Sequence, residues 1–500
     1  MSPLLLFSFI IGYFIILLVV AYFTSRKSNN ESFFIGNKNS NWMLVAFGMI
    51  GTSLSGVTFV SVPGAVAAES FAYFQITIGY LIGYLTIAFV LLPLYYRLNL
   101  TSIYNYLGNR LGFTSYKTGA SFFILSRTLG ATARLYLVVN ILQEAILKSF
   151  GVPFWLTTLV ILIMILLYTY EGGVKTIVWT DTLQTTCMLA GLIICVFYIL
   201  SQLHIGFADS LAAMHDKGYS TIFFTNPDSK LFFVKQILAG AFITITMTGM
   251  DQEMMQKNIS VKRLQDSQKN VVTLGIILLL VILLFLFLGG LLYLYADALG
   301  GHFVTNAAGA RSFMIDQSNA TGDKLFPVIA LKYMPPLVSV IFIIALISAL
   351  FPSADGAITA LTSSFCIDII GLQRNTTLDD NAKKKIRQRV HLTVAAIFLL
   401  FVMIYKWVNS PSMIGVILKV AAYTYGPLLG LFSFGILTKR TVNDKLVPVV
   451  CVAAPLLCII PDVFHKELFG SFELGPELLI INGLLTFIGL LLISKKQSAS

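Results

Sequence analysis

Thirteen long apolar segments, distributed along the whole chain, restrict its fold more than any other feature. A helix that crosses a bilayer needs about 20 mostly apolar residues, and helices satisfy every backbone group internally in lipid. The chain is 57% hydrophobic and 11% charged, whereas soluble domains carry about a quarter charged residues. We therefore predict an all-α multi-pass membrane protein. The segments lie near residues 3–24, 41–66, 71–96, 118–147, 153–170, 178–203, 231–256, 270–297, 327–366, 389–408, 411–437, 445–461 and 478–494.

The Lys and Arg residues are distributed unevenly between the two sets of loops. With the N-terminus outside, 22 of the 34 fall in cytoplasmic loops and the C-terminal tail, and 9 fall in the opposite loops. This bias follows the positive-inside rule and predicts a cytoplasmic C-terminus in a bacterial plasma membrane. The net charge of +11 is explained by this topology, so we expect no nucleic-acid partner. The first segment lacks the basic start and cleavage site of a signal peptide and is predicted to remain as a helix.

The polar residues of the sequence give no catalytic or metal centre. The five cysteines lie in apolar segments without the spacing of metal ligands, which favours packing roles. The sequence contains no nucleophile–base pair and no phosphate-binding glycine loop. We therefore expect neither an enzyme nor a bound cofactor, and no obligatory protein partner. The short connections predict a single membrane domain over residues 1–500, in contact with lipid and a small solute.

Two apolar segments contain glycine and hydroxyl residues at what should be mid-bilayer depth. In hydrocarbon each backbone N–H and C=O needs a partner, so such a stretch is favoured only beside a cavity or an ion. The alternative is that small residues merely allow tight helix packing. The residues concerned are Gly48, Gly51, Thr52, Ser53, Ser55, Gly56 and Thr58 in the second segment, and Gly240, Thr244, Thr246, Thr248 and Gly249 in the seventh.

The two interrupted segments stand five helices apart. Interrupted helices at matching positions in two halves are typical of transporters built from inverted repeats, with the binding site between the halves. We predict a first repeat in residues 41–205 and a second in residues 231–440. A peripheral first helix then falls within residues 1–40, and peripheral helices 12 and 13 fall within residues 441–500.

Charged side chains inside apolar segments are costly and by default mark an ion path, a binding site or an internal pair. Two of them, Arg127 and Arg134, stand seven residues apart on one helical face. A guanidinium is a bidentate partner for a carboxylate, which belongs either to a substrate or to Asp181 or Asp355. Asp181 has the alternative of an interfacial acid near the start of its helix. Lys419 is expected to snorkel or to pair.

Three stretches resemble signatures of the sodium:solute symporters. Residues 170–184 are similar to their loop-to-helix signature, residues 251–257 to the end of their seventh helix, and residues 425–440 to their eleventh. With the interrupted segment at 51–64 and the ninth helix, the resemblance spans residues 40 to 440. It implies the leucine-transporter-like fold, with a ten-helix inverted-repeat core formed by helices 2–11, alternating access, and sodium as the coupling ion.

The resemblance also implies a sodium site between the second and ninth helices. A hard cation takes oxygen ligands, which an unwound turn supplies without a full charge. Pro352 stands where a second hydroxyl residue is usual, so water, Asp181 or a shifted carbonyl must replace that ligand. Pro352 is also predicted to break the ninth helix locally. The expected ligands are the carbonyls of Gly51, Leu54 and Ala349 and the hydroxyl of Ser353.

Related symporters use the aspartate that matches Asp181 near a further sodium position on the ninth helix. Asp181 is therefore included among the expected sodium ligands. Asp355 and Gly356 stand where those symporters have serines. Asp355 is accordingly expected to pair with an arginine, or to bind a cation or a proton directly.

Sialic-acid transporters of this family hold the substrate carboxylate with an arginine at the place of Arg134. The resemblance thus implies a small organic acid as cargo, with a sialic-acid-like sugar acid as the leading candidate. The alternatives are a neutral sugar, vitamin or amino acid, exchange without sodium, and a transporter-like sensor. A sensor is disfavoured because the tail after residue 495 is expected to leave no output domain. The other expected substrate residues are Ser53, Ser55, Thr58 and Thr244.

Overall fold

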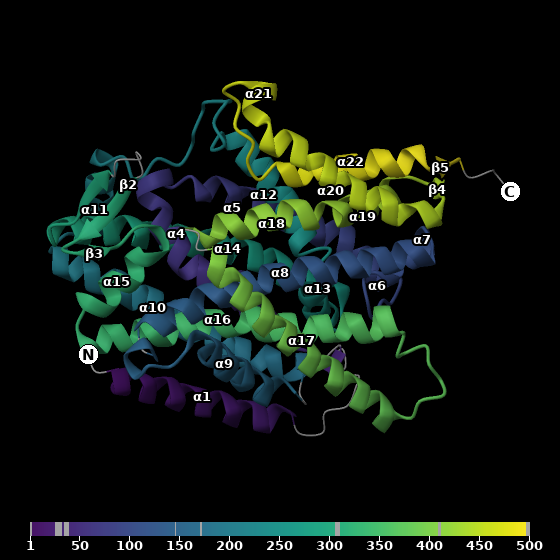
Figure 1. The fold of residues 1–500 in the computed structure, drawn as a ribbon, viewed down its shortest axis with the longest axis horizontal. Coiled ribbons are helices and arrows are strands. Elements are labelled where there is room, and N and C mark those ends of the chain that lie inside the picture. Colours follow the sequence, from purple (N-terminus) through teal and green to yellow (C-terminus); the bar gives the residue numbers. More distant parts are fainter. Residues whose placement is uncertain are drawn as a thin grey trace.

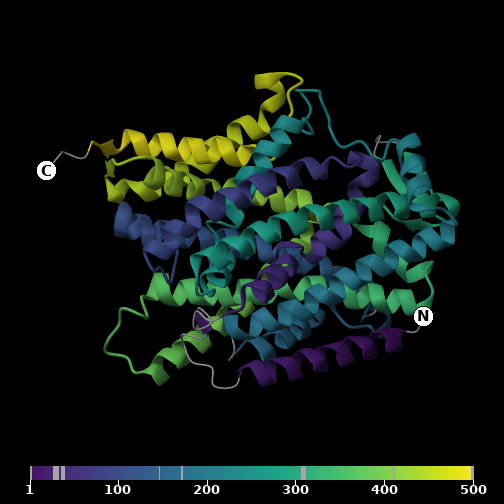
Figure 2. The same ribbon diagram turned by 180° about the vertical axis from the view of Figure 1, so that it is seen from behind.

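The computed structural model describes residues 3–25, 33–34, 40–145, 147–170, 173–305, 311–408 and 412–496. Within these residues the chain forms a bundle of long helices, with its two termini at opposite ends (Figure 1). We term the end at which α1 (Pro3–Ser25) begins the N-terminal end, and the other the C-terminal end. α1 lies along one edge of the bundle, and α20 (Val447–Val463) and α22 (Leu478–Leu492) lie along the opposite edge (Figures 1 and 2).

Every predicted apolar segment corresponds to a helix or to a bent pair of helices. Among the described residues, eight helices are long and apolar enough to cross a membrane, and three bent pairs each give one further span. Two shorter apolar helices of this part of the chain are α9 (Phe154–Thr169) and α22. This confirms the prediction of an all-α multi-pass fold. Glu171 and Gly172, in the first of the three symporter-like stretches, lie outside the described residues.

The remaining spans of the predicted first repeat are α3 (Trp42–Ser53) with α4 (Gly56–Glu69), α5 (Tyr73–Thr86) continued by the π-turn Ile87–Leu91 and α6 (Leu92–Arg97), α8 (Phe113–Ala145), and α10 (Gly173–Leu203). Those of the second are α12 (Phe233–Met247) with α13 (Gln252–Ile259), α14 (Leu264–Ala298), α16 (Pro336–Ser364) continued by the π-turn Phe365–Ile370, α17 (Asp380–Val408), and α18 (Met413–Thr424) with α19 (Gly426–Leu437).

Short elements connect the spans at the two ends. The helices among them are α7 (Asn105–Arg110), α11 (Phe207–Asp216), α15 (Leu325–Lys332) and α21 (His465–Phe469), with 3-10 turns at Leu147–Phe150, Gly322–Lys324 and Asp444–Leu446. An antiparallel three-stranded sheet of β1 (His302–Thr305), β2 (Arg311–Ile315) and β3 (Ser318–Asn319) lies at the N-terminal end. At the C-terminal end β4 (Thr441–Val442) pairs with β5 (Ser494–Lys495).

Both predicted interruptions are present. α3 and α4 meet at an angle of 55° around Leu54 and Ser55, of which Ser55 is extended with φ −77° and ψ 171°. α12 and α13 meet at 67°, and the carboxylate of Asp251 begins α13 by accepting the N–H groups of Glu253 and Met254 at 2.9 and 3.3 Å. Such a side-chain cap satisfies helix N–H groups that have no partner in the helix itself.

The structure contains a third bent span, which the sequence analysis treated as one unbroken segment. α18 and α19 meet at 46°. Pro427 stands in the first turn of α19, where its missing N–H costs no helical hydrogen bond. Conversely, the local break predicted at Pro352 is wrong, since α16 continues through this residue as one helix.

The alternative role of the small residues, tight packing between helices, is also present in the seventh segment, at Gly240. Gly240 of α12 lies against α5, where an added Cβ would lie 2.9 Å from the carbonyl carbon of Ile76. Gly79 of α5 is equally close, and its Cβ would lie 2.9 Å from the Cα of Gly240. Backbones approach this closely only where side chains are absent. One face of the seventh segment therefore serves helix packing, and this face includes Thr244, against which Gly83 of α5 packs closely.

Gly240→Val is expected to separate α12 from α5 and to lower the melting temperature of the detergent-purified protein. The new side chain would meet backbone atoms that cannot rotate away, and overpacking typically costs about 1–3 kcal/mol. Gly12→Val in α1 is the matched control, because no atom of the described residues lies within 4 Å of a Cβ built at Gly12. Equal melting temperatures for the two variants would contradict the close packing.

Candidate functional site

A cavity of about 110 Å³ lies at the bend between α3 and α4. Its walls come from that bend and from α5, α8, α12, α13, α14 and α18. Every residue predicted to bind substrate lines this cavity, namely Ser53, Ser55, Thr58, Arg134 and Thr244. The structure thus brings the whole predicted set together in one place, although these residues are far apart in the sequence.

The central cavity continues into a larger one of about 860 Å³ at the N-terminal end. The two share Tyr73, Ile414 and Leu418 in their walls. Lys419 lies in the wall of the larger cavity and pairs with Asp462 at 2.8 Å, which agrees with the expected pairing. The larger cavity therefore adjoins the central one on the side of the N-terminal end.

Asp323 lines the larger cavity. Its carboxylate accepts the N–H of Met413, the first residue of α18, at 2.9 Å. Burial raises the pKa of Asp323 to about 6. This loop carboxylate thus anchors the start of a helix that lines both cavities.

The two arginines of α8 have different surroundings. Arg127 is buried, its guanidinium pairs with the carboxylate of Glu253, and Asp251 Oδ2 lies 3.9 Å away. Both arginines line the central cavity, but in the described part of the chain no carboxylate lies within ion-pair distance of Arg134. The predicted internal pair of an arginine with Asp181 or Asp355 is therefore wrong for both arginines.

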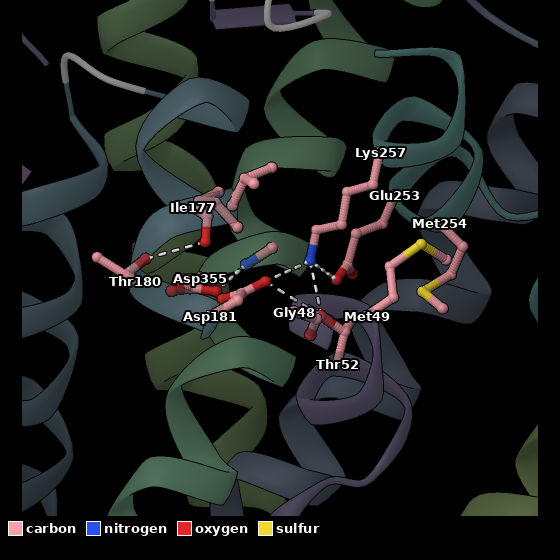
Figure 3. A network of polar contacts seen from close by, with 12 residues as sticks. Gly48, Met49, Thr52, Ile177, Thr180, Asp181, Glu253, Met254, Lys257 and Asp355 are labelled. Carbon is pink, nitrogen blue, oxygen red and sulfur yellow. Dashed lines mark hydrogen bonds and ion pairs between the residues drawn. The ribbon is translucent and has the colours of Figure 1, made fainter. Parts of the chain in front are cut away.

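A second ion pair joins α13 to α10. Lys257 Nζ lies 2.8 Å from Asp181 Oδ2 and donates to Thr52 Oγ1 at 2.7 Å, and the Thr52 hydroxyl donates to Asp181 at 3.2 Å. Glu253 Oε1 lies 3.5 Å from the same ammonium group. All four residues are buried, and Figure 3 shows their side chains converging.

These contacts correct two sequence interpretations. The charges expected inside the membrane did not include Asp251, Glu253 or Lys257, yet all three are buried. The signal was available, because Glu253 and Lys257 are four residues apart, the spacing of a helical ion pair. The interpretation of Asp181 as a helix-start acid is also wrong, since α10 begins at Gly173 and Asp181 is fully buried.

Asp355 lies on α16 and accepts a hydrogen bond from the hydroxyl of Tyr168 at 2.7 Å. No Lys or Arg of the described ranges forms an ion pair with it. The glycine at position 356, next to Asp355, is explained by packing, because an added Cβ there would lie 2.8 Å from Glu253 Cδ. The Glu253 side chain therefore takes the space that a larger residue would need.

Four of the five predicted sodium ligands occupy the bend of α3 and the middle of α16, and the fifth, Asp181, lies on α10. Gly51 packs against α16, and an added Cβ would lie 3.5 Å from Pro352 Cγ. The same Cβ would collide with the hydroxyl of Thr185 on α10. That hydroxyl is buried and has no hydrogen-bond partner among the described residues, whereas Ser353 Oγ donates to the carbonyl of Leu350 at 2.8 Å. An unpartnered hydroxyl oxygen and Pro352 therefore both lie beside Gly51.

Sequence reasoning missed the aromatic wall of the central cavity. Tyr73, Tyr80 and Tyr84 of α5 line it, and the hydroxyls of Tyr73 and Tyr80 lie 3.1 Å apart. Their spacing of seven and four residues places them on one helical face, which was the available signal. The cavity thus combines the guanidinium of Arg134, and that of the internally paired Arg127, with aliphatic and phenolic hydroxyls, a set that suits a hydroxylated acid.

Comparisons with known proteins agree with this arrangement. The family model of the sodium:solute symporter family matches residues 33–445. The chain is 22% identical to the sodium/sialic acid symporter SiaT of Proteus mirabilis, over 94% of this chain and 92% of that protein. It is 23% identical to the sodium/sialic acid symporter NanT of Aliivibrio fischeri, over 94% and 90%. The solved structure of a substrate-bound, outward-open Na⁺-coupled sialic acid symporter matches with a TM-score of 0.80 and 18% identity, over 98% of this chain and 99% of that one.

Proposed function

This chain belongs to the sodium:solute symporter family, and from that premise we propose that it imports a small organic acid together with sodium by alternating access. The observation that carries the proposal is the position of Arg134, which lines the central cavity without an acidic partner in the described part of the chain. A buried or half-buried guanidinium without a counter-charge is costly. A carboxylate on the solute would provide that counter-charge.

The proposed cargo is a hydroxylated acid, with a sialic-acid-like sugar acid as the leading candidate. Charge-assisted, bidentate hydrogen bonds from a guanidinium hold a planar carboxylate in a fixed orientation. The hydroxyls of Ser53, Ser55, Thr58 and the three tyrosines of α5 would then face the hydroxyl groups of the solute. The names of two similar proteins, both sodium/sialic acid symporters, support this choice of acid.

The coupling ion is proposed to bind beside this cavity, at the bend of α3. The ligands are the carbonyls of Gly51, Leu54 and Ala349, the hydroxyl of Ser353 and, in place of the one missing at Pro352, the hydroxyl of Thr185. Thr185 is included because its buried hydroxyl lies against Gly51 and has no hydrogen-bond partner among the described residues. Neutral oxygen ligands of this kind suit a monovalent hard cation.

The proposed topology places the N-terminal end outside the cell, in a plasma membrane with the C-terminus in the cytoplasm. The excess of Lys and Arg in the loops of the C-terminal end supports this orientation. The cavity of about 860 Å³ then faces the outside, so the described conformation is open to incoming solute. We further propose residues 41–205 and 231–440 as the two inverted repeats, since each begins with a bent span.

The test is uptake of a labelled sugar acid and of its neutral analogue into proteoliposomes, with and without an inward sodium gradient. The proposal expects sodium-driven accumulation of the acid and little accumulation of the analogue. Full uptake of the acid in potassium buffer without sodium would contradict the coupling. Equal uptake of acid and analogue would favour a neutral solute instead.

Ser353→Ala is expected to raise the sodium concentration for half-maximal uptake by roughly fivefold, because one hydrogen-bonding oxygen contributes about 1 kcal/mol and a factor of ten corresponds to about 1.4 kcal/mol. Thr185→Val should act in the same direction. Thr180→Val is the control. Thr180 lies on α10, as Thr185 does, and its hydroxyl donates to backbone carbonyls of α10. Unchanged sodium activation in both Ser353→Ala and Thr185→Val would remove these residues from the site.

A further inference from the structure

The ammonium group of Lys257 is surrounded by oxygen atoms as a bound cation would be. Asp181 Oδ2 lies at 2.8 Å, Thr52 Oγ1 at 2.7 Å and Glu253 Oε1 at 3.5 Å (Figure 3). These oxygens come from α10, α3 and α13, so the group lies where three helices meet. Two carboxylates and a hydroxyl are a ligand set for a hard cation, and here a protein side chain occupies it.

Two glycines make room for this oxygen shell. An added Cβ at Gly48 of α3 would lie 3.1 Å from the Cβ of Asp181. An added Cβ at Gly356 of α16 would lie 2.8 Å from the carboxyl carbon of Glu253. Any side chain at these positions would push one carboxylate away from the ammonium group. The shell thus depends on four helices that pack closely around one positive charge.

A tethered ammonium competes well against a free ion. Lys257 is 2% exposed and Asp181 is fully buried, so separating them would leave two charges unpaired in a medium of low dielectric. A sodium ion that replaced Lys257 at Asp181 would have to compensate that separation as well as its own dehydration. The second oxygen of Asp181, Oδ1, has no partner among the described residues and adds to the shell if the ammonium is removed.

We propose that Lys257 is the resident cation at Asp181, so that this protein binds one sodium ion per transport cycle, at the bend of α3, and not a second one at Asp181. The inference rests on the proposed sodium-coupled import, whose other ligands it leaves unchanged. Asp181, which was expected to be a sodium ligand, is then the ion-pair partner of Lys257 instead. Symport of one sodium ion with a monocarboxylate is then electrically neutral.

The first experiment counts sodium ions. Equilibrium binding of ²²Na⁺ to the detergent-purified protein is expected to give one ion per chain for the natural sequence and for Asp181→Asn. Lys257→Gln vacates the oxygen shell and is expected to give two. The double variant Asp181→Asn with Lys257→Gln removes the central carboxylate and should return the count to one. Lys262→Gln, at an exposed position five residues further on, is the control and should stay at one.

The second experiment uses the membrane potential. Uptake of a labelled monocarboxylate driven by a sodium gradient is expected to be unaffected by a valinomycin-imposed potential, whereas a two-sodium cycle would respond to it. Two ions bound by the natural sequence, falling to one in Asp181→Asn, would overturn the inference and leave sodium-coupled import intact. One ion in a folded Lys257→Gln variant would also overturn it. Absence of any sodium binding or sodium-dependent uptake would instead overturn the proposed function.

Lys257→Gln removes the ammonium group that Asp181 and Glu253 share and leaves buried negative charge uncompensated, so this variant can fail to fold. In that event the counts for the natural sequence, for Asp181→Asn and for the double variant decide the question. The double variant removes one charge of each sign and keeps the net charge of the cluster. Potential-sensitive uptake by the natural sequence would contradict the inference without any variant.

Discussion

Arg134→Lys is expected to lower the affinity for the carboxylate substrate by roughly a hundredfold, although the formal charge is retained. A guanidinium offers two parallel donors that match a carboxylate, whereas lysine offers a point charge on a flexible stem. Hydrogen bonds to charged groups contribute about 1.5–3 kcal/mol each, so the loss of one accounts for this effect. A binding titration of the labelled acid on detergent-purified protein at saturating sodium measures the change.

The neutral analogue that lacks the carboxylate provides the control for this experiment. It should bind equally well to the natural sequence and to Arg134→Lys, because Arg134 would make no charge-assisted contact with it. The melting temperature should also change little, since the described residues place no carboxylate in ion-pair contact with Arg134. Equal affinity of the natural sequence for acid and analogue would eliminate the carboxylate anchor and favour a neutral sugar, vitamin or amino acid.

The spans and the cavity residues were predictable because their signals are local. Runs of apolar residues define the helices, and glycine or hydroxyl residues at Gly51, Ser53 and Ser55 mark the bend of α3 in the sequence itself. Arg134 stood out because a charge within an apolar run is rare. Once the helices pack, the residues that break the apolar pattern are necessarily turned toward the interior, and so they meet at one cavity.

The pairing of the charges was not predictable, because it depends on contacts between distant helices. Lys257 follows the polar end of the seventh segment and resembles a loop residue until α13 is packed against α10 and α16. Arg127 and Arg134 are equivalent in sequence, and only the position of Glu253 assigns the first to an internal pair. The effect of Pro352 on the ninth helix was overestimated for a different reason. A helix buried on all sides tolerates the loss of one N–H when its neighbours hold the chain in place.

Glu253→Gln is expected to reduce the stability of the protein by about 3–5 kcal/mol, which is the usual cost of removing one partner of a buried ion pair. Arg127 has side-chain exposure of 5%, and its remaining acid, Asp251, is 3.9 Å away and already accepts hydrogen bonds from the start of α13. The guanidinium would therefore be left largely uncompensated. Yield of monodisperse protein and the melting temperature in detergent report the loss.

The matched control for this change is Glu144→Gln. Glu144 pairs with Lys148 at 2.7 Å, but both side chains are more than half exposed, at 56% and 67%. Exposed pairs contribute about 0–1 kcal/mol, so this variant should keep nearly the natural melting temperature. The double variant Arg127→Gln with Glu253→Gln removes both buried charges and should recover much of the lost stability. If Glu253→Gln melted like Glu144→Gln, the pair between α8 and α13 would not hold these helices together, and Arg127 would be free to act on the solute alongside Arg134.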